Sequence, residues 1–557
     1  MSDIAQAITP LDMFYHWEGI KPDALYLRQP VKQAWRDYSW RQAGDQARRI
    51  AAALRDLGLG PGERVCILSK NCAHWIISDL AIMMSGASSA PAFTSMTAED
   101  VLYILEHSGS KALVVGETDN WQVVREILPG HIKVIALPFA DVPGADHAWD
   151  DLLTRYEPLP GNPQRDPQDE ITTIYTSGST GLPKGVVYNF EGAGHIVRNL
   201  GHGFRMSEED RLISYLPLAH GFERGAVDFM SMYAGCTVGF NESQATFAAD
   251  MREVRPTVFQ CVPRLWTKFQ ESVVAQFGGQ QALDALLADP DKAEQTKNGI
   301  KQALGLDAGR ILLTGSAPTP LPLHAWYDAL DMPLCEIYGQ SEVLSGSCNL
   351  PWDRKPGTLG KPTWNTEIRI TDIGEILIKA DAVMTGYLHE PEKTAETLVD
   401  GWIHTGDKGE IDEDGFLKVT GRVKEIFKTA KGKYVAPVPI EGLFVANPHL
   451  EQVCLVGSGL PQTVLLVQLS AEGRSTDASA VEEQLREEIR QVNAELDSHA
   501  QIACALIVKD EWTSANGLVT HTMKIKRSAL EARYGGLAEE AFGGDVSAKD
   551  PGVIWEQ

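Results

Sequence analysis

Ten residues, Thr176 to Gly185, read TSGSTGLPKG and combine hydroxyl side chains, three glycines and one lysine. Closely spaced glycines let backbone N–H groups turn toward an anion, and Ser and Thr hydroxyls add donors for phosphate oxygens. A Walker A loop is excluded, because Lys184 follows a proline, precedes a glycine and leads into VVYN, which favours a strand over a helix. The composition therefore predicts either a phosphate-binding loop between two strands or a surface linker.

The order of residues in this loop is more specific than its composition. TSGSTGLPKG, preceded by ITTIY, resembles the signature loop of the adenylate-forming (AMP-binding) enzymes, which include acyl-CoA synthetases, peptide-synthetase adenylation domains and luciferases. Further segments resemble that family's motifs in the family's order: GSAP (315–318), YGQSE (338–342), DGWIHTGDKGEIDEDGFLKVTGRVKEIFK (400–428) and NGLVTHTMKIKR (516–527). The last has the form found in long-chain acyl-CoA synthetases.

Taken singly, the residues in these motifs have ordinary explanations. Asp407 beside Gly406 suits a turn, Glu342 suits a helix start, and a lone lysine such as Lys524 is most often solvated on a surface. The five motifs together, in order and spacing, favour the functional interpretation.

The resemblance implies a role for each matching residue. ATP phosphates would be held by Thr176, Ser177, Gly178, Ser179, Thr180, Gly181 and Lys184, adenine by Gly315, Ser316, Ala317, Pro318, Tyr338 and Gly339, phosphate and carboxylate by Ser341, and the ribose by Asp407 and Arg422. Glu342 would help to hold Mg²⁺, Lys424 would be an inter-domain hinge, and Lys524 would be the lysine of the adenylation step. Lys431, in TAKGKYVAP, would contribute to the thioester-forming face, with Lys428 as a competing candidate.

The same resemblance implies a two-step ligase reaction. A carboxylate would attack ATP to give acyl-AMP and pyrophosphate, and the thiol of CoA would then displace AMP. SYLPLAHGFER (214–224) and TVFQCVPRLWTKF (257–269) resemble the long-chain branch, which places His220 between the nucleotide and the acyl group. AVDFMSMYAGC (226–236) is apolar enough to line an acyl tunnel, although apolar stripes more often face a core. The expected acid is a fatty or other hydrophobic one of undetermined chain length.

Other readings stay open at this point. The enzyme could load its acyl-AMP onto a carrier protein, or could close a β-lactone. A silent nucleotide- or fatty-acid-binding protein on the same fold is a third alternative, disfavoured because Lys524, Glu342, Asp407 and Arg422 are all present.

Alternation of β-branched runs with helix-period segments predicts how the motifs are positioned. Runs such as RVCILS (64–69), ITTIYT (171–176) and RILLTG (310–315) predict a large N-terminal α/β domain of mainly parallel sheets with flanking helices. From about residue 355 shorter strands predict a β-rich subdomain, including a hairpin that turns at Asp414-Gly415. Residues 1–421 would form this domain, and residues 422–557 a small mobile α+β domain, with GGLAEEAFGGDVSAKDPG as a loose tail.

Composition limits the partners. The 557 residues carry a formal net charge of −25, which argues against a nucleic-acid partner because duplex binding needs a basic face. The eight cysteines show no CxxC pair, which predicts reduced thiols and no structural zinc. No signal peptide or membrane-spanning segment is apparent. We expect a cytoplasmic protein and leave peripheral membrane contact and oligomeric state open.

Overall fold

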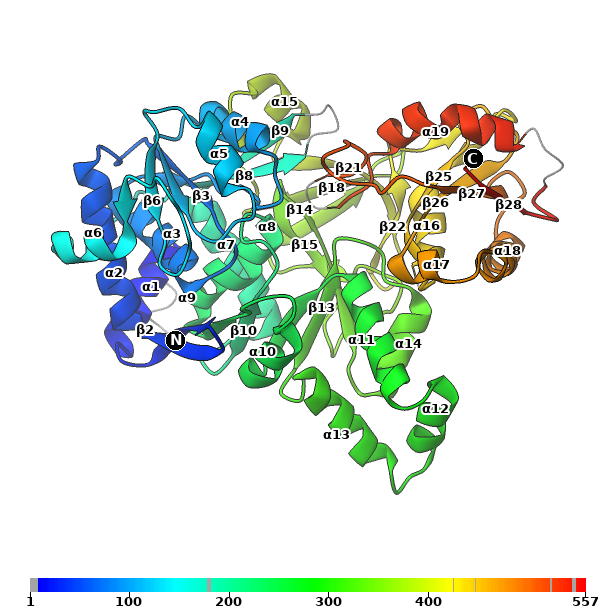
Figure 1. Ribbon diagram of the computed structural model, residues 1–557, viewed down its shortest axis with the longest axis horizontal. Coiled ribbons are helices and arrows are strands. Elements are labelled where there is room, and N and C mark those ends of the chain that lie inside the picture. The colour runs from blue at the N-terminus through cyan, green and yellow to red at the C-terminus, as the bar shows by residue number, and fades with distance from the viewer. Residues whose placement is uncertain are drawn as a thin grey trace.

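The computed structural model describes residues 9–177, 182–423, 425–445, 447–520, 523–542 and 547–556. A large N-terminal domain and a smaller C-terminal domain lie beside each other, with β18 (Glu375–Ala380) and β21 (Trp402–Ile411) drawn between them (Figure 1). The predicted α/β class is confirmed.

The largest sheet has eight strands in the order β19-β9-β8-β4-β3-β5-β6-β7. The strands from β8 to β7 run parallel, whereas at one edge β9 pairs antiparallel with β8 and β19 pairs antiparallel with β9. Their bounds are β3 Arg64–Leu68, β4 Ser88–Ser89, β5 Ala112–Val115, β6 Lys133–Ala136, β7 His147–Ala148, β8 Glu170–Ser177, β9 Pro183–Asn189 and β19 Gly386–Tyr387. This sheet carries the candidate phosphate loop between β8 and β9.

Two more sheets complete the α/β body, each with parallel strands and an antiparallel edge. The first has the order β10-β11-β1-β2, with β10 Arg211–Ser214, β11 Thr237–Phe240, β1 Leu25–Val31 and β2 Ala34–Ser39. The second runs from β12 to β16 in chain order, with β12 Val258–Cys261, β13 Ile311–Gly315, β14 Leu334–Gln340, β15 Val343–Cys348 and β16 Lys361–Pro362. The GSAP and YGQSE motifs follow β13 and occupy the end of β14, so the topology places them side by side.

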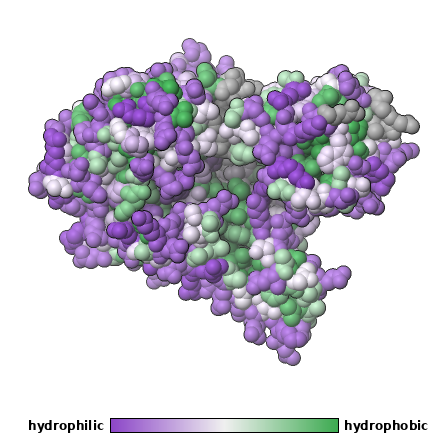
Figure 2. All heavy atoms as spheres, viewed as in Figure 1, coloured by the Kyte–Doolittle hydropathy of each residue, from purple (hydrophilic) through white to green (hydrophobic). Residues whose placement is uncertain are grey.

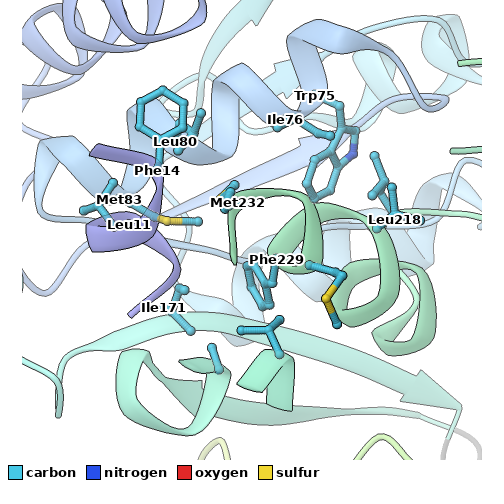
Figure 3. Packing of buried hydrophobic residues seen from close by; sticks show 14 of the residues in the cluster. Leu11, Phe14, Trp75, Ile76, Leu80, Met83, Ile171, Leu218, Phe229 and Met232 are labelled. Atoms are coloured by element: carbon cyan, nitrogen blue, oxygen red, sulfur yellow. The ribbon is translucent and has the colours of Figure 1, made fainter. Parts of the chain in front are cut away.

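Helix α3 (Ala73–Ser85) occupies the centre of the N-terminal core. Every one of its residues is buried, and it ends at Gly86 with a left-handed φ of 102°. Its apolar side chains pack against α1 (Pro10–Ile20) and against the segment around Phe229 and Met232 (Figure 3). Burial of such side chains is the main favourable contribution to folding.

The N-terminal part contains further helices beside these sheets. They are α2 Trp40–Asp56, α4 Ala98–Ser108, α5 Trp121–Ile127, α6 Trp149–Arg155, α7 Phe190–Phe204, α8 Gly221–Glu223, the π-helix Arg224–Phe229, α9 Met230–Ala234, α10 Phe247–Val254, α11 Pro263–Gln276, α12 Gln280–Ala288, α13 Ala293–Leu304 and α14 Leu321–Ala329. Among the residues described, no helix combines the length and apolar character needed to cross a membrane.

The β-rich region is an antiparallel sheet that ends in the predicted hairpin. It comprises β17 Thr366–Ile370, β18, β20 Leu398–Val399, β21 and β22 Leu417–Arg422, with α15 Pro391–Thr397 beside it. Asp412 Oδ1 accepts hydrogen bonds from the N–H groups of Asp414 and Phe416, and Gly415 has a φ of 86°. The Asp-Gly turn is therefore confirmed.

The C-terminal part has its own four-stranded sheet in the order β25-β26-β27-β28. These strands are Leu450–Val456, Thr463–Leu469, Ile502–Val508 and Gly552–Trp555, accompanied by the short pair β23 Phe427–Lys428 and β24 Tyr434–Val435, and by α16 Pro437–Glu441, a 3₁₀ turn Gly442–Phe444, α17 Ala471–Ser475, α18 Ala478–Glu495 and α19 Arg527–Phe542. Separate apolar clusters cover the two faces of this sheet.

The loose tail predicted for residues 535–552 is wrong for α19 up to Phe542 and for the start of β28 at Gly552, while residues 543–546 lie outside the described residues. Helix α19 continues through Gly535 and Gly536 to Phe542, and β28 pairs in parallel with β27. Leu530, Tyr534 and Ala538 share one helix face and are buried against the sheet. The glycines obscured this pattern because small side chains give a weak apolar periodicity.

Candidate active site

An open cavity of about 2310 Å³ lies between the two domains. The molecular surface is visibly hollowed there (Figure 2). It brings together most of the predicted site residues, namely Thr176, Lys184, His220, Gly315, Ser316, Ala317, Pro318, Tyr338, Gly339, Ser341, Glu342, Asp407, Arg422 and Lys524. Gly178, Ser179, Thr180, Gly181 and the hinge candidate Lys424 lie outside the described residues, and Ser177 ends β8.

The ends of the candidate phosphate loop are paired strands. Thr176 lies opposite Lys184 in the antiparallel β8–β9 ladder, so Lys184 stands in a strand and not at a helix N-terminus. Gly185 is required here, because a Cβ atom would come within 2.7 Å of Thr173 Cγ2. Tyr103 supports the same end, its hydroxyl donating to the carbonyl of Pro183 at 3.1 Å. The strand–loop–strand prediction agrees with this pairing.

Lys184 points its ammonium group toward the cavity wall formed by Tyr387, 5.4 Å from the centre of that ring. Burial lowers the pKa of Lys184, and the charge of Lys393 lowers it further, while Glu342 acts in the opposite direction. A cation held in this way, with like charge beside it, favours an anionic ligand.

Glu342 carries the carboxylate expected to hold Mg²⁺. Its Oε1 accepts a hydrogen bond of 2.6 Å from the hydroxyl of Tyr387, and its side chain faces the cavity. No group of three or more His, Cys, Asp or Glu side chains suited to a metal occurs among the described residues. A single oriented carboxylate nevertheless fits Mg²⁺, which usually takes one or two carboxylates plus substrate phosphates and water.

Asp407 is the centre of a hydrogen-bonded group. Its Oδ2 accepts from the hydroxyl of Tyr338 at 2.6 Å and from Nε2 of Gln340 at 2.7 Å, and Arg422 Nε lies 3.0 Å from Oδ1. The Asp407 side chain is only 7% exposed, whereas that of Arg422 is 50% exposed. The carboxylate is thus fixed in direction while the arginine remains accessible from the cavity.

The GSAP segment forms a tight loop after β13. Ser316 has a left-handed φ of 68°, and the loop is closed by a 3.0 Å hydrogen bond between the hydroxyls of Thr314 and Thr319. Gly315 is fixed by packing, because a Cβ atom there would lie 2.9 Å from the carbonyl oxygen of Ile337. This close approach to β14 places the loop next to Tyr338.

Lys524 projects from the C-terminal domain into the same cavity. A turn presents it, in which Lys524 N donates to Thr520 Oγ1 at 3.0 Å and its carbonyl accepts from Thr520 N at 2.8 Å. The surrounding protein lowers the pKa of its ammonium group, and Arg422 lowers it further, while Asp407 and Glu342 raise it. The lysine therefore faces the groups proposed to bind nucleotide.

His220 lines the cavity beside an aromatic ring, with 6.4 Å between its ring centre and that of Phe93. Burial lowers its pKa to about 4, with a further contribution from the charge of Lys524, so the ring is neutral near pH 7. Its Nδ1 accepts the N–H of Phe222 at 3.2 Å. The cavity lining also includes the apolar side chains of Phe93, Met96, Ile174 and Leu344.

The segment 226–236 does not contribute to this wall. Val227, Phe229, Met230 and Met232 are buried in the core cluster. Phe229 and Met232 lie among side chains of α1 and α3 (Figure 3). For these residues the core-packing alternative holds, and the acyl-tunnel alternative is wrong. Periodicity marks an apolar face but does not say which surface it meets.

Lys431 is not brought to the cavity in this arrangement. It is exposed in the turn between β23 and β24 and does not line the cavity. Its competitor Lys428 places its ammonium group 5.5 Å from the ring centre of Tyr434. A role for either lysine thus requires another arrangement of the domains.

Sequence reasoning missed two side chains that orient the polar groups. Gln340 holds Asp407, and Tyr387 holds Glu342. Gln340 stands inside the YGQSE motif at its variable position, so only its place in the motif could have drawn attention to it. Tyr387 lies far from Glu342 in sequence, and no spacing signal connects the two.

Comparison with known proteins identifies the family of this chain. The family model described as AMP-binding enzyme matches residues 14–388, and that described as AMP-binding enzyme C-terminal domain matches residues 424–544. The chain therefore belongs to the AMP-binding enzyme family.

Named relatives span nearly the whole chain. It is 29% identical to the long-chain-fatty-acid–CoA ligase FadD15 of Mycobacterium bovis, covering 95% of this chain and 96% of that protein. It is 28% identical to the long-chain-fatty-acid–CoA ligase 5 of Rattus norvegicus, covering 91% and 84%.

Solved structures share the fold. The anthranilate CoA ligase AuaEII in complex with anthranoyl-AMP matches with a TM-score of 0.76 at 22% identity, covering 94% of this chain and 97% of that chain. The Mycobacterium tuberculosis fatty acyl CoA synthetase matches with a TM-score of 0.64 at 22% identity, covering 95% and 99%.

Proposed function

We propose that this protein is a fatty acid–CoA ligase that activates a hydrophobic carboxylic acid with ATP and transfers the acyl group to CoA. The observation that carries the proposal is the position of Lys524 in one cavity with Lys184, Glu342 and the Asp407–Arg422 pair. Family membership and the printed names of the relatives support it.

In the first half-reaction a carboxylate oxygen of the acid forms a bond to the α-phosphorus of ATP. The bond from that phosphorus to the bridging oxygen breaks, and pyrophosphate leaves with the electron pair. Positioning and charge neutralisation carry such steps, with little covalent help from the protein. We assign the neutralisation of charge on the reacting oxygens to Lys524. Binding of the β- and γ-phosphates is assigned to Lys184, Thr176, Ser177 and the loop residues Gly178, Ser179, Thr180 and Gly181.

The nucleotide would be held on three sides. Asp407, whose direction is fixed by Tyr338 and Gln340, would accept hydrogen bonds from the ribose hydroxyls. The accessible Arg422 would donate further hydrogen bonds to the ribose. The loop Gly315–Pro318 and Gly339 would line adenine, and Ser341 would contact the phosphate and carboxylate. Mg²⁺, when bound at Glu342, would supply positive charge for the phosphate oxygens.

In the second half-reaction the thiol sulfur of CoA bonds to the acyl carbonyl carbon and the thiol proton passes to solvent. The bond from that carbon to the phosphate oxygen breaks, and AMP leaves with the electron pair. This step would use a rotated C-terminal domain, residues 422–557, moving about Lys424 and withdrawing Lys524. Lys431 would then reach the cavity, which is consistent with its exposed position in the β23–β24 turn.

The acid is proposed to be a medium- or long-chain fatty acid. We assign the neutral His220 to the boundary between nucleotide and acyl group, and the apolar side chains of Phe93, Met96, Ile174 and Leu344, which line the same cavity, to the acyl group. An alkyl chain gains free energy by leaving water for such a wall, about 0.8 kcal/mol for each methylene buried.

The decisive measurement separates the ligase from its alternatives. The purified protein is incubated with ATP, Mg²⁺ and fatty acids of graded length, with and without CoA, while pyrophosphate and acyl-CoA are quantified. We expect pyrophosphate and acyl-CoA together. Pyrophosphate without a thioester would instead indicate a carrier-protein loader or a β-lactone former, and neither product with any acid would indicate a binding protein.

A further inference from the structure

Apart from the Asp407–Arg422 pair at the domain boundary, one ion pair joins the two domains among the described residues. Arg264, the second residue of α11, places Nη2 at 2.6 Å from Oε2 of Glu451, in β25, and its Nη1 also donates to the backbone carbonyl of Glu451. Among the residues that the structure describes, no other ion pair connects residues 9–421 with residues 425–556. Because the guanidinium of Arg264 contacts Glu451 at two points, it fixes the orientation of Glu451 as well as its distance from α11.

A short series of contacts connects this pair to Lys524. The residue after Glu451 is Gln452, whose Nε2 donates to the carbonyl of Met523 at 3.2 Å, and Met523 immediately precedes Lys524. Arg264 and Glu451 themselves line the cavity into which Lys524 projects. Holding Glu451 against α11 therefore also holds the segment that presents the lysine.

The Arg264–Glu451 ion pair is exposed enough to break and re-form. The side chains of Arg264 and Glu451 are 40% and 33% exposed, so water and salt can compete for both groups. Glu271, on the same helix, lies near Arg264: burial and the charge of Glu472 raise the pKa of the Glu271 carboxyl, and the charge of Arg264 lowers it. The Glu271 carboxylate therefore favours an arginine at position 264 and opposes an acidic replacement there.

We propose that Arg264 and Glu451 are a positioning pair for acyl-AMP formation, which holds the C-terminal domain in the orientation that places Lys524 in the cavity. The pair acts through Lys524 and does not touch the reacting atoms. It must break before the domain can turn for thioester formation. This inference rests on the proposed function, and it adds the contact that selects between the two half-reactions.

The test separates the half-reactions. Variants Arg264→Gln, Glu451→Gln and the double variant are assayed for pyrophosphate release without CoA, and separately for thioester formation from preformed acyl-AMP and CoA. We expect each single variant to lower adenylation roughly twofold to tenfold, as for loss of a part-exposed charge-assisted contact. The double variant should be no worse than the more damaged single variant, because both remove the same contact. Thioester formation should be unchanged or faster.

A matched control removes an exposed ion pair of similar length elsewhere. Arg255→Gln breaks the 2.5 Å contact with Asp307 inside the N-terminal domain and should change neither half-reaction. Equal loss of both half-reactions in the Arg264 and Glu451 variants, or effects of the two substitutions that simply add, would overturn the proposal.

A structural readout keeps the inference independent of activity. Small-angle X-ray scattering of the wild-type protein and of the double variant should show a broader set of domain orientations in the variant, and none of this change in Arg255→Gln. If the wild-type protein makes no acyl-AMP, the proposed function fails while this comparison still decides whether the pair holds the domains. Identical scattering profiles would refute the positioning role.

Discussion

Asp407 and Arg422 lie opposite each other in the β21–β22 ladder, with Arg422 Nε 3.0 Å from Asp407 Oδ1. The ladder sets the backbone spacing, and the other carboxylate oxygen is held by Tyr338 and Gln340. Three partners from two different sheets thus orient one buried carboxylate, which is the arrangement expected of a group that must meet a ligand in a fixed direction.

Replacing Asp407 by Asn should weaken ATP binding while the protein stays folded. We expect the KM for ATP to rise roughly 10- to 100-fold, because hydrogen bonds to a charged group contribute about 1.5–3 kcal/mol. Initial rates of pyrophosphate release measure this effect. The exposed Asp372→Asn in the β17–β18 turn is the control, and an unchanged KM in Asp407→Asn would contradict the ribose assignment.

Lys524 should set the alkaline limit of adenylation. Its pKa is lowered by the surrounding protein and by Arg422, so the protonated form that neutralises phosphate charge is lost as pH rises through that lowered pKa. Lys524→Arg should extend activity to higher pH, because a guanidinium stays protonated. Lys524→Ala should reduce adenylation by roughly 10²- to 10³-fold.

The control for Lys524 is the other half-reaction. Thioester formation from preformed acyl-AMP should fall far less in Lys524→Ala than adenylation does. Equal loss of both would show that the lysine supports the fold or the binding of all ligands, and not the first step.

Glu342→Gln should raise the Mg²⁺ concentration needed for half-maximal adenylation by at least roughly tenfold, because loss of a carboxylate oxygen removes the charge that Mg²⁺ prefers. Tyr387→Phe deletes the hydroxyl that orients Glu342 and should give a smaller shift in the same direction. Titration of activity with Mg²⁺ at fixed ATP measures both. If neither titration shifts, Glu342 has no part in metal binding.

Glu223 should make the stability of the N-terminal domain depend on pH. Burial raises its pKa from 4.5 to about 8, although Gln260 and Ser214 donate to it. The unfolded carboxyl therefore loses its proton near pH 4.5 while the folded one keeps it, and stability falls between pH 4.5 and 8. The slope is about 1.4 kcal/mol for each pH unit.

Urea unfolding of the wild-type protein and of Glu223→Gln at pH 5, 6 and 7 checks this slope. The wild-type protein should lose stability relative to the variant as pH rises, because glutamine has no proton to retain. The control variant Glu413→Gln, at an exposed turn, should show the same pH dependence of the free energy of unfolding as the wild-type protein. A constant difference between wild type and Glu223→Gln would show that Glu223 does not carry the effect.

Local features of the site could be predicted because they depend on neighbours in sequence. The proline and glycines around Lys184 specify two strands flanking a loop, and the Asp-Gly turn specifies the hairpin that brings Arg422 opposite Asp407. The contacts of Gln340 with Asp407 and of Tyr387 with Glu342 join residues far apart in the chain. No local spacing encodes such contacts.

The sequence by itself determined the family, the alternation of strands and helices, and the residue types that meet ATP, since these are carried by ordered motifs and by periodicity. Only the tertiary structure decided that Phe229 and Met232 face the core, that α19 runs through two glycines, and that Arg264 meets Glu451 across the cavity. The physical reason is common to all three. An apolar stripe or a charged side chain is stabilised by a partner of a particular kind, which the sequence indicates. The packing of elements that are distant in the chain determines which residue that partner is.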